Sequence, residues 1–136
     1  MSYSILIVDD STLVRRLIRS LIEPCHAWRV CGEAENGEIA VQRVRVKELH
    51  PDVVILDFQM PVMNGIEAAC QIAHLAPDTA MVMLTMHSSE QLSREARAAG
   101  IKDVLSKFDG VANHLIASLN SVVLTPKPSF PDSAAS

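Results

Sequence analysis

The sequence predicts an α/β fold in which helices alternate with the five parallel strands of a doubly wound sheet. The first observation is a set of three continuous apolar runs, at residues 5–8, 53–56 and 81–84. Strands that are buried on both faces of a parallel sheet are apolar throughout instead of alternating. The second observation is that helical patterns separate these runs, and such alternation favours right-handed crossover connections within one sheet.

Two weaker strand candidates, at residues 28–31 and 103–106, complete the predicted sheet. The first helix has a leucine at every fourth position, beside a second apolar row, while its arginines fall mostly on the opposite, solvated side. These leucines are Leu13, Leu17 and Leu21, and the arginines are Arg15, Arg16 and Arg19. The remaining helices are expected at residues 38–49, 66–75, 89–99 and 110–124.

Length and composition favour one small globular domain. The chain has 136 residues, of which 49% are hydrophobic and 21% charged, so it has the material for a packed core. The net charge of −4 argues against nucleic-acid binding by this chain alone. No apolar run reaches 18 residues and the start does not resemble a signal peptide, so we expect a cytoplasmic protein without a membrane span.

The last dozen residues differ in composition from the rest. Three of the seven prolines, Pro126, Pro128 and Pro131, fall here among small polar residues. Proline-rich segments of this kind serve as linkers or tails. We therefore expect one folded domain over residues 1–124 and a Pro/Ser-rich tail or linker over residues 125–136.

Polar residues follow four of the five predicted strands. Asp9 and Asp10 come after the first strand, Asp57 after the third, Thr85 at the end of the fourth and Lys107 after the fifth. The carboxyl ends of parallel strands meet at one edge of the sheet, where ligands bind in open α/β folds. A single aspartate at such a junction usually caps a helix. Three carboxylates, a hydroxyl and a lysine together indicate a binding site.

The residue types at this edge narrow its chemistry. Three nearby carboxylates repel one another unless a cation joins them, and oxygen ligands suit Mg²⁺. Lys107 and Thr85 suit an anionic ligand such as a phosphoryl group. Metal on one side and anion contacts on the other are typical of phosphoryl transfer, with a carboxylate as nucleophile. Asp57 lies after the central strong strand and is the natural acceptor.

The motifs at this edge resemble the response-regulator receiver family of two-component signalling. The resemblance covers residues 3–124, and the motifs that carry it are Asp9-Asp10, Asp57-Phe58-Gln59-Met60-Pro61-Val62-Met63-Asn64-Gly65, Leu84-Thr85, Gly100 and Leu105-Ser106-Lys107. The stretch Met83-Leu84-Thr85-Met86-His87 is also similar to receivers of regulators that carry a helix-turn-helix output domain, which implies a role in transcription regulation.

The resemblance implies a flavodoxin-like (βα)5 fold and a phospho-acceptor. Asp57 would take a phosphoryl group from a phosphohistidine of a sensor histidine kinase or phosphotransfer protein. Asp10 and Asp57 would bind Mg²⁺ directly, Asp9 largely through water, and Gln59 through its backbone carbonyl. The domain would signal by a conformational or oligomeric change, with a homodimer as one form, and would not be an enzyme beyond assisting its own phosphorylation and dephosphorylation.

The resemblance also gives roles to the residues around the acceptor. Thr85 and Lys107 would bind phosphoryl oxygens. Gln59 and His87 occupy positions that tune hydrolysis of the acyl phosphate in the family, although an exposed loop residue is the simpler interpretation of His87. The last helix has no charged side chain, so its outer face, with Asn113, His114 and Ser118, either faces water or forms a contact surface.

Three positions depart from the family pattern. Val104 stands where an aromatic residue is usual, Met86 where a small residue follows the threonine, and Phe108 where proline often follows the lysine. We therefore expect a damped or rewired conformational switch. The alternatives are a degenerate receiver that acts as a phosphorylation-independent scaffold and a Mg²⁺-dependent phosphohydrolase, which would normally place an aspartate at the position of Gln59.

Overall fold

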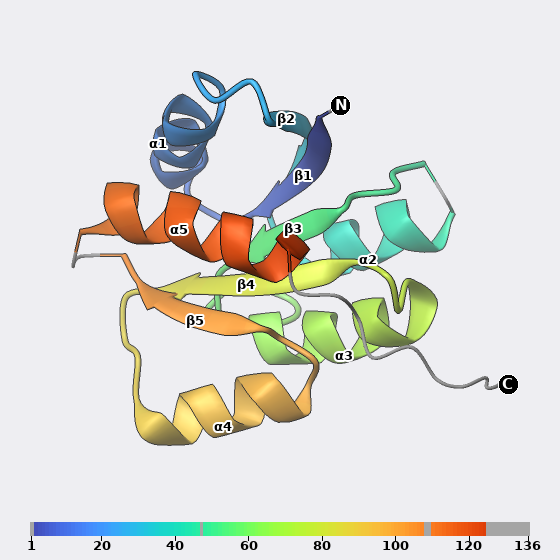
Figure 1. Cartoon of the computed structure of the whole chain (residues 1–136). Helices are drawn as coiled ribbons and strands as arrows, with labels where there is room; N and C mark the ends of the chain where they lie inside the picture. Colours follow the sequence, from blue (N-terminus) through green and yellow to red (C-terminus); the bar gives the residue numbers. More distant parts are fainter. Residues whose placement is uncertain (1, 47, 108–109, 125–136) are drawn as a thin grey trace, which may run out of the picture.

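The computed structural model describes residues 2–46, 48–107 and 110–124, and within them five strands alternate with five helices (Figure 1). The strands are β1 (Tyr3–Val8), β2 (Trp28–Ala34), β3 (Val53–Leu56), β4 (Ala80–Thr85) and β5 (Asp103–Ser106). The helices are α1 (Thr12–Ile22), α2 (Gly37–Arg45), α3 (Gly65–Leu75), α4 (Glu90–Ala98) and α5 (Val111–Leu124). The predicted fold class is confirmed, while Phe108 and the predicted tail lie outside the described residues.

All five strands are parallel and lie in the order β2-β1-β3-β4-β5. This is the flavodoxin-like order, in which β2 lies on one side of β1 and the next strand in the chain, β3, lies on the other side, so the order reverses at β1. The reversal makes β1 and β3 neighbours, so the loops that leave their carboxyl ends run to opposite faces. Ligands bind at this switch point in doubly wound folds.

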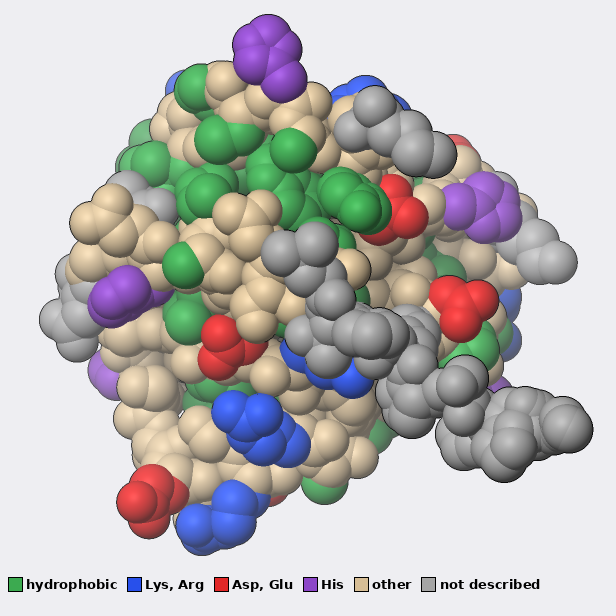
Figure 2. Space-filling view, viewed as in Figure 1, with side chains coloured by type: hydrophobic (Ala, Val, Ile, Leu, Met, Phe, Trp, Pro, Cys, Tyr) green, Lys and Arg blue, Asp and Glu red, His purple; other side chains and the backbone are tan. Residues whose placement is uncertain are grey.

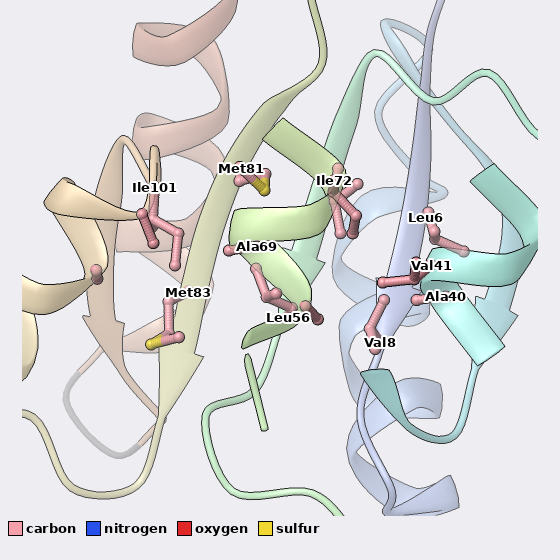
Figure 3. Close-up of a cluster of buried hydrophobic side chains, with 14 of the residues drawn as sticks. Leu6, Val8, Ala40, Val41, Leu56, Ala69, Ile72, Met81, Met83 and Ile101 are labelled. Carbon is pink, nitrogen blue, oxygen red and sulfur yellow. The ribbon is translucent and has the colours of Figure 1, made fainter. Parts of the chain in front are cut away.

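Helices cover both faces of the sheet, with α1 and α5 on one face and α2, α3 and α4 on the other (Figure 1). Successive side chains of a strand point to opposite faces. Ile5 and Ile7 therefore pack beneath α1 and α5. Leu6 and Val8 pack on the other face, beneath α2 and α3 (Figure 3). The apolar runs are continuous because each face has its own core.

The structure corrects the predicted bounds of α2 and β2. The helix ends at Arg45, four residues before the predicted end at Leu49. The Arg43 carbonyl accepts hydrogen bonds from the N–H groups of Glu48 and Leu49, which turns the chain toward β3. Strand β2 runs to Ala34, three residues beyond the predicted end.

The leucine row of α1 is not its buried face. Leu13 is 76% exposed and Leu17 is 49% exposed, whereas Ile18 and Ile22 of the neighbouring row are buried. Figure 2 shows hydrophobic side chains gathered in the upper part of the face that α1 and α5 cover. The second apolar row thus anchors the helix, and part of the leucine row remains at the surface.

Helix α5 packs on the sheet through Leu115 and Leu119, which are fully buried. Ser118 is buried as well and donates a hydrogen bond of 2.7 Å to Asp103 Oδ2 on β5, so the expectation that it faces water is wrong. Asn113 and His114 are exposed, as expected. In the part of the chain that the structure describes, no helix has the length and apolar character needed to cross a membrane.

Candidate functional site

Asp57 lies directly after β3 and is held by backbone contacts on both sides. Its N–H donates to the Val8 carbonyl at 3.0 Å, and its Oδ1 accepts from the Phe58 N–H at 2.8 Å. Gly65, the first residue of α3, lies so close that a Cβ atom there would stand 2.1 Å from the Asp57 carbonyl oxygen. Only glycine permits this approach, so Gly65 helps fix the backbone of Asp57.

Asp9 and Asp10 leave β1 beside Asp57. One carboxylate oxygen from each of the three aspartates lies within 4.8 Å of the other two. Asp9 is 2% exposed and Asp57 is 7% exposed, while Asp10 faces solvent. The structure therefore brings together the three carboxylates that the sequence placed at one edge, two of them shielded from water.

Lys107 is a cation in contact with two of these carboxylates, those of Asp9 and Asp57. Its Nζ lies 2.7 Å from Asp9 Oδ2 and 3.2 Å from Asp57 Oδ2. Its backbone N–H donates to the Thr85 carbonyl at 2.9 Å, so the residue is fixed at the end of β4 and β5. The predicted acceptor and its predicted ammonium partner thus form an ion pair.

Burial and charge act in opposite directions on this pair. Burial raises the pKa of Asp57, the ammonium of Lys107 lowers it and the charge of Asp9 raises it, and the net result is a raised pKa. Burial disfavours the charged form of Lys107, but the hydrogen bond to Asp9 and the charges of Asp57 and Asp9 outweigh it, so the pKa of Lys107 is also raised. Lys107 therefore remains a cation at neutral pH.

Thr85 and the residues that follow it form another wall of the site. Thr85 is buried, and its Oγ1 accepts a hydrogen bond of 3.3 Å from the His87 N–H. The His87 side chain is exposed, as the simpler interpretation of the sequence has it. Met86 is half exposed and lines an apolar hollow of about 220 Å³ with Leu17, Val111 and their neighbours on α1 and α5.

Gln59 and Val104 border two different surface depressions. Gln59 is exposed and lines a shallow depression with Asp10, Phe58 and Asn64. Val104 is half-buried, packs against the core beneath α2, α3 and α4, and borders a hollow beside α4. Gln59 therefore lies beside the carboxylates, and Val104 lies on the α4 side of β5.

The donor set fits a hard divalent cation. Three carboxylates carry three negative charges, and Lys107 offsets one of them. Oxygen-only sites with water completing the coordination shell suit Mg²⁺. Asp10, which is exposed, leaves such an ion open to water and to an incoming ligand.

Arg15 also contacts this site, although the helix pattern predicts a solvated face for it. Its Nη1 donates to the Asp9 carbonyl at 2.5 Å, and its Nε donates to Glu33 Oε1 at 2.8 Å. Glu33 at the end of β2 also pairs with Arg19. The sequence shows Arg15 and Arg19 on one predicted helix and Glu33 just beyond the strand predicted at residues 28–31. Only the fold shows that these residues pair.

Comparison with known proteins gives consistent results. The model of the family described as "Response regulator receiver domain" matches residues 5–119. The chain is 40% identical over 103 residues to the transcriptional regulatory protein YdfI of Bacillus subtilis. The matched region covers 76% of this chain and 47% of YdfI. It therefore spans about half the length of YdfI.

Two further similarities cover nearly the whole of the other chain. The chemotaxis protein CheY of Thermotoga maritima is 36% identical over 107 residues, 79% of this chain and 87% of CheY. The crystal structure of the response regulator domain of Thermotoga maritima CheB superimposes with a TM-score of 0.84 at 28% identity, over 93% of this chain and 100% of that domain. The chain thus belongs to the response regulator receiver family.

Proposed function

We propose that Asp57 accepts a phosphoryl group from the phosphohistidine of a sensor histidine kinase or phosphotransfer protein, in a Mg²⁺-dependent reaction. The observation that carries this proposal is the convergence of Asp9, Asp10 and Asp57 with Lys107 at one edge of the sheet. Receiver domains are signalling domains that histidine kinases phosphorylate and that bind Mg²⁺ in an acidic pocket.

Asp9, Asp10 and Asp57 would hold the ion, with the backbone carbonyl of Gln59 as a further ligand. The ion supplies positive charge to the phosphoryl oxygens. An Asp57 carboxylate oxygen forms the new bond to phosphorus while the bond from phosphorus to the histidine nitrogen breaks, and the leaving imidazole keeps the electron pair. Lys107 pairs with one phosphoryl oxygen, and the Thr85 hydroxyl donates to another.

The alternatives have less support. A degenerate receiver would lack part of the acceptor machinery, whereas Asp57, Lys107 and Thr85 lie together here. A phosphohydrolase with an aspartyl nucleophile needs a general acid, and Gln59 has no ionisable proton to give. The position two residues beyond Asp57 therefore favours a phospho-acceptor over a hydrolase.

The phosphoryl group would change the conformation or oligomeric state of the domain and so reach an output, in the cytoplasm. YdfI is named a transcriptional regulatory protein, and the same output is our proposal for the protein to which this domain belongs. The domain itself acts as a substrate that assists its own modification and not as an enzyme with turnover.

The test is phosphorylation by a small phosphodonor in the presence of Mg²⁺. We expect the wild-type chain to acquire one acid-labile phosphoryl group and Asp57→Asn to acquire none. Asp52→Asn is the matched control, because Asp52 lies just before the opposite end of β3 and bonds Ser4. Stoichiometric labelling of Asp57→Asn, or failure of the wild-type chain to label, would overturn the proposal.

A further inference from the structure

Arg15 lies in the first turns of α1 with a side chain that is only 14% exposed. Its guanidinium makes three contacts. Nη1 donates to the Asp9 carbonyl at 2.5 Å, Nε donates to Glu33 Oε1 at 2.8 Å, and Nη2 donates to Thr12 Oγ1 at 3.3 Å. A partly buried arginine with three directed hydrogen bonds is held in place, unlike the long flexible side chains of a solvated helix face.

The Asp9 carbonyl belongs to the peptide that joins Asp9 to Asp10. On the other side of Asp9, its N–H donates to the Ala34 carbonyl at 3.0 Å. Arg15 and Ala34 therefore hold the backbone of Asp9 from both ends. The orientation of the Asp9–Asp10 peptide determines where the Asp10 side chain projects. By binding the carbonyl oxygen of this peptide, Arg15 therefore helps position the carboxylates of both Asp9 and Asp10.

Glu33 in turn holds Arg15. One of its oxygens accepts from Arg15, and the other accepts from Arg19 Nε at 3.0 Å and Nη2 at 2.8 Å. Arg19 reaches Glu33 and Glu23 but makes no contact with Asp9 among the described residues. Two arginines thus share one glutamate, and only one of them reaches the acidic site.

We propose that Arg15 is a positioning residue that sets the Mg²⁺ affinity of the acidic cluster by clamping the Asp9 carbonyl. The inference rests on the metal site of the proposed function. Partners that orient metal ligands commonly change metal affinity by about 10- to 100-fold when they are removed. Asp10 is exposed and has freedom to move, so loss of the clamp at its preceding peptide disperses the three carboxylates.

The experiment is a Mg²⁺ titration without any phosphodonor, followed by the NMR amide signals of Asp10 and Phe58. We expect Arg15→Ala to weaken Mg²⁺ binding roughly tenfold. Arg19→Ala is the matched control, since it removes the other partner of Glu33 and spares the Asp9 carbonyl. Equal Mg²⁺ dissociation constants for wild type, Arg15→Ala and Arg19→Ala would overturn the inference.

Arg15→Lys separates position from charge. Lysine keeps the charge but has no planar fork that reaches Asp9 and Glu33 together, so we expect it to bind Mg²⁺ more weakly than wild type. Full recovery by lysine would assign the effect to charge and overturn the clamp. If Arg15→Ala fails to fold in a thermal melt, Glu33→Gln tests the same clamp from its other side, with unchanged affinity again counting against it.

The same titration distinguishes failure of this inference from failure of the proposed function. A wild-type chain that binds no Mg²⁺ would remove the metal site and the proposed function with it. A wild-type chain that binds Mg²⁺ as tightly as Arg15→Ala does would leave the proposed function intact and remove only the positioning role.

Discussion

The carboxyl edge of the sheet and the surfaces beside β4 and β5 differ in how closely they follow the family pattern. At the edge, the aspartates, the threonine and the lysine are all present, and the ion pair of Lys107 with Asp57 is formed. Val104 on β5 and Met86 after β4 stand where the resemblance to the family leads us to expect an aromatic and a small residue. The edge that would carry the proposed phosphorylation thus keeps the family pattern, whereas the surfaces beside it depart from that pattern.

The two unusual side chains also face different partners. Val104 borders a hollow beside Arg94 of α4 and Ser89, the residue that caps this helix. Met86 borders the apolar hollow between α1 and α5, and Lys107 borders that hollow as well. If Lys107 moved toward a phosphoryl group, we would expect the surroundings of Met86 and of the hollow between α1 and α5 to change more than those of Val104.

We expect the largest effect from Gly65→Ala, which would displace the backbone of Asp57 at the carboxyl edge of the sheet. A Cβ atom at this position would stand 2.1 Å from the Asp57 carbonyl oxygen and 3.0 Å from its carbon, so the acceptor backbone must move. We expect a loss of about 2–3 kcal/mol in the free energy of unfolding, measured by denaturant titration, together with a strong fall in the rate of phosphorylation.

Gly32→Ala is the matched control for this prediction. Its Cβ would meet the Leu49 Cδ1 atom at 2.9 Å, and the end of a flexible leucine side chain can shift. We expect a smaller loss of stability and an unaltered phosphorylation rate. A Gly65→Ala chain that is phosphorylated as fast as wild type would show that the edge tolerates a displaced acceptor.

A smaller effect concerns the readout. With a phosphoryl mimic and Mg²⁺ bound, we expect the NMR amide signals of Lys107 and Met86 to shift more than those of Val104 and α4. The reason is that a valine has no aromatic ring to rotate inward as Thr85 moves. Val104→Tyr should increase the shifts in α4 while the phosphorylation rate stays the same. Large shifts throughout α4 in the wild-type chain would contradict the damped or rewired switch.

The smallest effect concerns the lifetime of the acyl phosphate. Gln59 and His87 are exposed two residues beyond Asp57 and Thr85, from where they would influence how water reaches a phosphoryl group on Asp57. We expect Gln59→Ala and His87→Ala each to change the half-life a few-fold, which corresponds to less than about 1.4 kcal/mol in the activation free energy. Decay of the acid-labile label measures it, and identical decay in both variants and wild type would remove this tuning role.

The fold was predictable because its determinants are local. Apolar runs such as 53–56 belong to strands with a core on each side, and the helices α3 and α4 begin at the caps Asn64 and Ser89, next to the predicted starts. The end of α2 was not predictable in the same way. Apolar residues continue the helical pattern as far as Leu49, and what ends the helix is a turn of the chain around the Arg43 carbonyl.

The sequence predicts those site residues that directly follow a strand, because the carboxyl ends of parallel strands lie at one edge of the sheet. Asp57 and Lys107 are far apart in the chain, yet each is marked by the strand before it. No neighbouring strand identifies Arg15 in the sequence, because its partner Glu33 is 18 positions away. The pairing of β2 with β1 places Glu33, and the register of this pairing shifts between Ile5 and Leu6. A helix pattern alone cannot show which arginine turns toward a strand end.

The short contact between Lys107 and Asp9 has a consequence for cation binding at this edge. The ammonium lies 2.7 Å from Asp9 Oδ2, so a divalent cation that binds beside Asp9 meets a positive charge already in place. The affinity of the edge for such a cation would then reflect the attraction of three carboxylates less the repulsion of one ammonium. Under the proposed function, the same ammonium lies 3.2 Å from Asp57 Oδ2, where a phosphoryl group would add negative charge.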